Sequence, residues 1–329
     1  MIYKPPRLSN RRDFFAFQYV KAKTPHYDFF AGQPSLDRTK NKHVKVGSLP
    51  KKAVRLDRNS SMAWIVVRYS HDPKSAIPRP MKAERIWQMA ADVRHQMFGQ
   101  TGRVKIDISQ IVRRTQAMTV NDVPMSTYWD IDHSVTDMCG QSVMGETSIN
   151  QDEPNTIMVS INNDLILYNK SLALSSCCHE LGHILFDGPG WIRNIADGHQ
   201  VPSQKPLMFS DSVLVRPKQG VKAEKSNVDW SEWRANEFMG GFLVPKKLLK
   251  NEMVKSAASY GVSVLDGKSG SVDDDLVVDI LGSDQYKVSC FLDWLAERFG
   301  VSVCFIKVRL AKYNLIYTQS QRSASNGFW

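Results

Sequence analysis

Three residues in one short stretch have the types and spacing found in metal-dependent hydrolases. The stretch is "CCHELGHILFDGPG", residues 177 to 190, and it contains His179, Glu180 and His183. On a helix, residues four apart return to nearly the same face, so His179 and His183 could bind one zinc ion through imidazole nitrogens. Glu180 lies one step round the helix, where a general base could take a proton from the attacking water.

An ordinary core helix with two incidental histidines would have a similar sequence pattern, since apolar residues lie on another face at Leu174, Cys178, Leu181 and Leu185. "DGPG" from Asp187 predicts a sharp end to the helix, followed by a loop-rich region over residues 188 to 228. A catalytic zinc usually takes three protein ligands, so a third ligand would decide between the two interpretations. Spacing leaves several downstream candidates open: His199, Glu224, Glu232 and Glu237.

The segment "HELGHILF", followed by "EWRANEFMGGFLVP", resembles the ImmA/IrrE family of metallo-endopeptidases. That family pairs a His-Glu-x-x-His helix with a later Glu-x-x-Ala-Asn-x-Phe helix that ends in Leu-x-Pro. The matching positions here are Glu232, Ala235, Asn236, Phe238, Leu243 and Pro245. The resemblance implies that Glu232 is the third ligand of a Zn²⁺ cofactor and that Glu237 falls at a variable position. The alternative for Glu232 is a capping box with Asp229.

The resemblance covers roughly residues 81 to 316 and implies an α+β fold. The core would be zincin-like, of the gluzincin type, with a small antiparallel sheet and a C-terminal helical segment. Periodicity also predicts a helix through Ile86 and Met97, and a β-hairpin from "VMGETSIN" and "TIMVSIN". We therefore expect a basic extension over residues 1–80, a metallopeptidase domain over 81–260 and the helical segment over 261–329.

By resemblance, the expected activity is zinc-dependent endopeptidase cleavage of a specific partner protein. That partner would be a helix-turn-helix repressor or an antitoxin, cut during a stress, phage or mobile-element response. The strand "TIMVSIN" could pair through its backbone with an extended substrate. His199, in the loop after the first ligand helix, is a candidate for stabilising the oxyanion, although a lone loop histidine is more often incidental.

The positive charge of the chain is concentrated in its first quarter. Residues 1 to 80 contain 17 Lys and Arg against 5 Asp and Glu, while the other 249 residues contain 26 against 28. Seven aromatic residues lie between Phe14 and Phe30. This combination could bind single-stranded or double-stranded DNA by stacking and phosphate neutralisation, or the aromatics could dock on the rest of the protein. The candidate nucleic-acid contacts are Arg11, Arg12, Lys21, Lys23, Lys51 and Lys52.

These features keep a second class of function open. The chain could be a nucleic-acid-binding regulator, or a component of a mobile element or virion, in which zinc is structural or accessory. "AERFGVSVCFIKVRL", from Ala296, has helix-turn-helix spacing, but the second helix is mostly apolar, which favours packing in a bundle. Glu180 argues against a purely structural zinc site, because such a site needs no base.

Five cysteines without regular spacing do not predict a disulfide framework, and a reducing cytoplasm fits them better. Cys177 and Cys178 are expected to pack in the core, while Cys139 is the better candidate for a redox switch at the zinc site. The first residues lack a secretory signal pattern, and the apolar runs are too short to span a membrane. We therefore expect a cytoplasmic location and no membrane partner.

Overall fold

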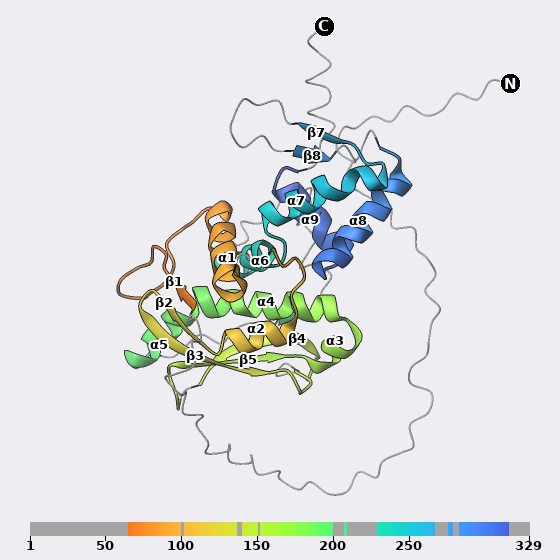
Figure 1. The fold of residues 1–329 in the computed structure, drawn as a ribbon. Coiled ribbons are helices and arrows are strands. Elements are labelled where there is room, and N and C mark those ends of the chain that lie inside the picture. Colours follow the sequence, from red (N-terminus) through yellow and green to blue (C-terminus); the bar gives the residue numbers. More distant parts are fainter. Residues whose placement is uncertain are drawn as a thin grey trace, which may run out of the picture. The chain divides into compact units, whose positions relative to one another are not determined.

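The computed structural model describes residues 65–99, 102–136, 140–150, 152–199, 207–208, 229–266, 276–278 and 283–315 of the 329. They all fall within one unit, Asn59–Trp329, and combine helices with a sheet (Figure 1). The expected α+β class is therefore confirmed. No helix in the described ranges has both the length and the apolar character needed to cross a membrane.

A six-stranded sheet has the order β1-β2-β3-β5-β4-β6. The strands are β1 (Ile65–Val67), β2 (Ala117–Val120), β3 (Val123–Asp130), β4 (Val143–Ile149), β5 (Thr156–Ile161) and β6 (Leu207–Met208). Asn121 and Asp122 both have positive φ and form the tight turn between β2 and β3. A separate hairpin joins β7 (Val264–Asp266) to β8 (Leu276–Val278).

The sheet is mixed, so the expectation of an antiparallel sheet is wrong. The predicted hairpin of β4 and β5 is present and antiparallel, but β1 runs parallel to β2 and β3 runs parallel to β5. The reason is topological: the chain passes from β3 to the far side of β5, forms β4 there, and returns through β5 beside β3. Because β5 is paired on both sides, "TIMVSIN" cannot offer a free edge to a substrate, as the sequence analysis had expected.

Residues 65 to 80, which the sequence analysis placed in the N-terminal extension, belong to the folded unit. Strand β1 pairs with β2, and Ile65 and Val67 are buried in the main core. The Tyr69 hydroxyl donates to the carbonyl oxygens of Leu185 and Phe186, at 2.8 and 3.3 Å. The proline-containing segment "SAIPRP", which ends at Pro80, packs on the fold, since its Ala76 is buried. Residues 65 to 80 are therefore described as part of the fold.

Helix α4 packs on the large sheet, and other helices of the unit pack on α4 or on one another. They are α1 (Ala83–Phe98), α2 (Ile108–Arg114), α3 (Asn163–Tyr168), α4 (Lys170–Phe186), α5 (Gly188–Ala196), α6 (Trp230–Leu243), α7 (Lys246–Ser256), α8 (Gln285–Phe299) and α9 (Val303–Lys312). Helix α4 lies between the sheet on one side and α6 with α1 on the other (Figure 1). Nearly every side chain of α4 from residue 173 to 186 is therefore buried, not only one stripe.

Two segments depart from the sequence expectations. Residues 188–196 form α5, although "GPG" had predicted a loop, because Pro189 lies in the first turn, where its missing N–H costs nothing. The C-terminal helices also share the main core with α4 and α6, through residues such as Phe291, Phe299 and Phe305. Helices α8 and α9 thus contribute to the same hydrophobic core.

Candidate metal centre

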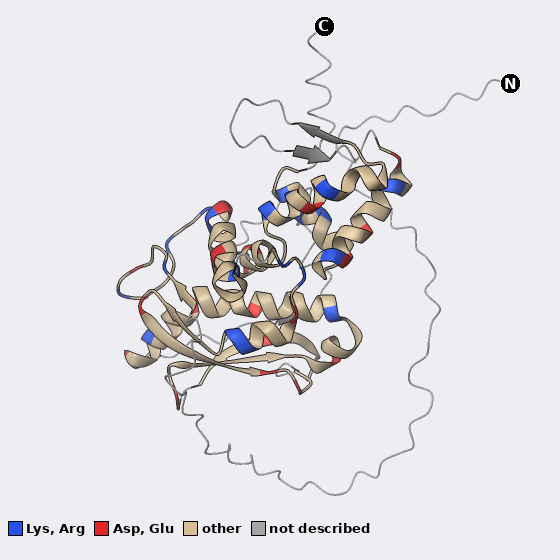
Figure 2. Ribbon diagram, in the orientation of Figure 1, with Lys and Arg blue, Asp and Glu red and all other residues tan. Residues whose placement is uncertain are grey.

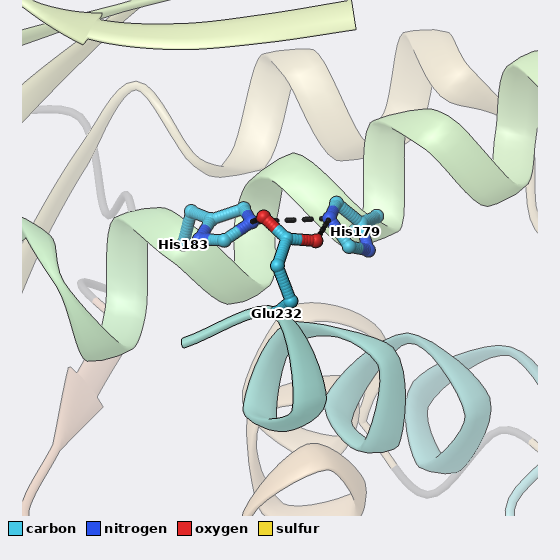
Figure 3. A group of neighbouring side chains, drawn as sticks. All are labelled: His179, His183 and Glu232. Atoms are coloured by element: carbon cyan, nitrogen blue, oxygen red, sulfur yellow. Dashed lines mark hydrogen bonds and ion pairs between the residues drawn. The ribbon is translucent and has the colours of Figure 1, made fainter. Parts of the chain in front are cut away.

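Helices α4 and α6 bring three potential metal ligands together. The Nε2 atoms of His179 and His183, one turn apart on α4, lie 3.0 Å from each other. Glu232, in the first turn of α6, places its two carboxylate oxygens 3.3 Å from Nε2 of His179 and 3.4 Å from Nε2 of His183 (Figure 3). Both histidines are buried and Glu232 is about one-third exposed at its side chain, 35%. The cluster is therefore exposed to solvent on the Glu232 side.

These distances fit a zinc ion. In a tetrahedral site with bonds of about 2.0–2.1 Å, neighbouring ligand atoms are about 3.3 Å apart. The two Nε2 atoms are 3.0 Å apart, and the separations of 3.3 and 3.4 Å join them to the two different carboxylate oxygens of Glu232. Two imidazoles with one carboxylate also form the donor set of a catalytic site, which leaves a fourth position open. The residues present thus fit the group that the sequence predicts.

The electrostatics of the cluster favour a cation. Burial alone would lower the pKa of His183, but hydrogen bonds to Asp187 and Glu232 outweigh it and raise the pKa to about 10. Burial likewise opposes ionisation of Glu232, yet its bonds to both histidines hold its pKa well below the usual range. Without a metal, the carboxylates draw a proton onto His183; a bound metal ion would take the place of that proton.

A set of outer contacts orients the two histidines. Asp187 Oδ2 lies 2.8 Å from His183 Nδ1 and accepts the Ser231 hydroxyl at 2.5 Å, while Arg234 donates to Asp187 Oδ1 at 2.9 Å. Asn236 Oδ1 lies 3.2 Å from His179 Nδ1. Such partners fix which ring nitrogen faces the metal.

Sequence reasoning missed the roles of Asp187, Ser231 and Arg234. The one available signal was that Asp187 lies four residues after His183, one helical turn on.

Glu180 is not one of the three clustered ligands, and a residue of the sheet holds its side chain in place. Its Oε2 accepts the Thr147 hydroxyl at 2.6 Å, and its side chain is almost completely buried. A Cβ added to Gly145 would lie 3.4 Å from Glu180 Cγ, so β4 passes directly alongside the base. Glu180 therefore lies against strand β4, and its charge is one of those that raise the pKa of His183.

Other predicted site residues do not join the cluster. His199 follows α5 and is exposed, and it is not among the three clustered ligands. Glu237 is buried on a different face of α6, where it contacts Trp87 Nε1 at 2.7 Å and pairs with Arg309 and Lys312.

Several further expectations can be compared with the described residues. Cys177 and Cys178 are fully buried, as expected, and burial raises the pKa of both thiols. Cys139, Glu224 and the six basic contacts Arg11, Arg12, Lys21, Lys23, Lys51 and Lys52 lie outside the described residues.

The C-terminal helices are packed as the sequence analysis favoured. Phe305, Ile306 and Leu310 of α9 are buried, and Lys312 is paired with Glu237. Figure 2 shows lysine and arginine along the helices, α7 to α9 included, and few on the strands of the large sheet. The second helix of the helix-turn-helix pattern is therefore largely a core element.

Comparison of the chain with family models, curated proteins and solved structures gave no match.

Proposed function

We propose that the protein is a zinc-dependent endopeptidase. The observation that carries this proposal is the convergence of His179, His183 and Glu232 at distances that fit a tetrahedral ion, with Glu180 buried beside them. A zinc ion held there would polarise a water molecule and the scissile carbonyl. The resemblance to the ImmA/IrrE family, carried by "HELGHILF" and "EWRANEFMGGFLVP", supports the same assignment.

The residues of the chain then have distinct roles in peptide hydrolysis. Glu180 takes the proton of the attacking water and delivers it to the leaving amine. Thr147 holds Glu180 in place through the bond to Oε2. His179 and His183 keep their Nε2 atoms toward the centre because Asn236 and Asp187 occupy their Nδ1 atoms.

The edge of β4 is the surface we assign to an extended substrate. Strand β6 pairs with β4 at Val143 and Gly145 and extends no further in the described part of the chain. By the alternation of an antiparallel strand, the backbone groups of Thr147 and Ile149 face the same side as those of Gly145. A peptide paired there would lie beside Glu180. We propose a protein substrate of the repressor or antitoxin type, as the family resemblance implies.

Two measurements test this function. Metal analysis of protein purified without added metal should find one zinc per chain, and His183→Ala should abolish it. An internally quenched peptide library, together with the product of a neighbouring gene, provides the activity assay. Glu180→Gln should keep the zinc and lose cleavage, because an amide cannot accept the proton. Absence of zinc in the wild type, or cleavage at the wild-type rate by Glu180→Gln, would reject the proposal.

A second candidate function is nucleic-acid binding with an accessory or structural zinc site. One observation favours it: the first 80 residues contain 17 Lys and Arg but only 5 Asp and Glu. Under this alternative, Glu180→Gln would leave every activity of the protein unchanged. DNA binding by a full-length protein that lacks peptidase activity would therefore support the alternative.

A further inference from the structure

We infer that Gly182 is a positioning residue for the metal centre, because its contact with Ala235 sets the spacing between the two ligand helices. The inference rests on the proposed metal site and concerns how Glu232 is brought to the histidines. Helices α4 and α6 pack extensively on each other along this crossing.

The contact at Gly182 is closer than any side chain would permit. A Cβ added there would lie 2.8 Å from the Ala235 Cα, 3.2 Å from its Cβ and 3.2 Å from its carbonyl oxygen. Non-bonded carbon atoms prefer separations of about 3.5–4.0 Å. Two of the three neighbours are backbone atoms, so no side-chain rotation relieves the overlap. Even alanine at position 182 would force α6 away from α4.

The position of this contact couples it to the ligands. Gly182 lies between His179 and His183 in the sequence, and Ala235 lies three residues, about one turn, after Glu232. This tight contact between the helices is thus within about one turn of every ligand. Both histidines are on α4, so a displacement of α6 moves Glu232 relative to both of them.

The size of the displacement can be compared with what the metal tolerates. Bringing the 2.8 Å contact to an ordinary separation requires a shift of about 0.7–1.2 Å. Metal–ligand distances tolerate only about 0.2 Å. Rotation of the flexible Glu232 side chain recovers part of the shift, so we expect weakened binding in place of complete loss. A fall in zinc affinity of about tenfold or more is the expected size, as for other changes that misorient a ligand.

Gly241 provides a matched control, because it lies on α6, the helix that carries Glu232 and Ala235. A Cβ at Gly241 would lie 3.0 Å from the Trp87 Cα and 3.2 Å from the Ala90 Cβ, so its nearest neighbours belong to α1. Gly241 is nine residues after Glu232, more than two turns away. Gly241→Ala should therefore cost stability through packing while leaving zinc affinity within about threefold of the wild type.

The experiment uses full-length metal-free protein as wild type, Gly182→Ala and Gly241→Ala. Zinc affinity is measured by competition with a chromophoric chelator. The visible spectrum of the Co²⁺ form reports the ligand set, and thermal unfolding reports stability. We expect Gly182→Ala alone to bind zinc at least tenfold more weakly, with altered cobalt bands. Wild-type affinity and spectrum in Gly182→Ala, or an equal loss in Gly241→Ala, would overturn the inference.

Failure of the proposed metal site and failure of the positioning role give different results. If Gly182→Ala does not fold, Ala235→Ser adds a single atom to the other side of the same contact. That variant should weaken zinc binding in the same direction by a smaller factor, and unchanged affinity in it would also overturn the inference. If the wild type itself binds neither zinc nor cobalt, the proposed function fails. If only the Gly182→Ala result fails, the metal site stands and the positioning role is lost.

Discussion

Replacing Glu237 with glutamine tests whether a buried ion pair stabilises the packing of α9 on α6. The carboxylate accepts from Trp87 Nε1 at 2.7 Å and pairs with Arg309 at 3.3 Å and with Lys312. Arg309 is 2% exposed, and its Nε and one terminal nitrogen have no hydrogen-bond partner in the described part of the chain. Glutamine keeps the shape of the side chain but leaves this guanidinium without its counter-charge.

The expected loss follows from the burial of the pair. Removing one partner of a buried ion pair costs about 3–5 kcal/mol. Two features place Glu237→Gln at the lower end: Lys312 is 40% exposed at its side chain, and the Arg309 guanidinium also lies over the rings of Trp87 and Tyr313. We therefore expect a loss of about 3 kcal/mol in the free energy of unfolding. For a unit of this size that corresponds to a fall in Tm of roughly 5–10 °C.

The assay is urea unfolding followed by circular dichroism, with zinc content measured on the same samples. Zinc should remain, as the sequence analysis predicts, because Glu237 contacts α1 and α9 and not the histidines. Glu297→Gln, a change at an exposed position of α8, is the control and should shift stability by less than about 0.5 kcal/mol. A loss below about 1 kcal/mol for Glu237→Gln with an unchanged urea slope would refute the reasoning.

The same pair predicts a dependence on pH. Burial would raise the pKa of Glu237, but Lys312, Trp87 and Arg309 together outweigh it and hold the pKa below its usual value. A carboxyl with a lowered folded-state pKa stabilises the protein above its unfolded-state pKa of about 4.3, and that contribution is lost as pH falls through the folded-state value. The stability difference between wild type and Glu237→Gln should therefore be full at pH 7 and shrink steadily below about pH 4.3.

Three other changes test the site and the basic extension. Asp187→Asn should weaken zinc binding about 10–100-fold in chelator competition, because it disturbs the partner of His183, whereas Asp197→Asn, at an exposed position after α5, should not. Thr147→Val should keep zinc but slow peptide cleavage about 10-fold or more, since one hydrogen bond to the Glu180 carboxylate is lost; an unchanged rate would contradict that role. Changing the six candidate basic contacts of residues 1–80 to glutamine in the full-length chain should weaken DNA binding and flatten its salt dependence, and equal binding would place the DNA contact elsewhere.

Local patterns were enough to predict the helices that carry the ligands. The i, i+4 spacing of His179 and His183 and the capped start of α6 at Asp229 are properties of a few neighbouring residues. Spacing alone could not choose Glu232 over Glu237, because that choice depends on which face of α6 meets α4. The structure separates them: Glu232 faces the histidines, and Glu237 faces Trp87 and α9.

The remaining contacts could not be predicted from the sequence, because they join distant parts of the chain. Thr147 meets Glu180 only through the position of β4 against α4, 33 residues apart in sequence. The order of the strands is also non-local, which is why β5 could be mistaken for a strand with a free edge. By contrast, Asp187 lay within one turn of His183, and a search for carboxylates at that spacing would have found it.

The two hydrogen bonds from the Tyr69 hydroxyl, described above, connect residues 116 and 117 positions apart, at the end of the ligand helix. A ribosome releases Tyr69 long before the carbonyl groups of Leu185 and Phe186 exist, so these two hydrogen bonds can form only after α4 has emerged. Helix α6 then depends on Arg309 and Lys312, which are made later still. The cluster of His179, His183 and Glu232 can therefore reach its final packing only after the residues of α9 have been made. A nascent chain that ends before α9 would present the two histidines without a firmly held Glu232, so the proposed metal site would form only after α9 has been made.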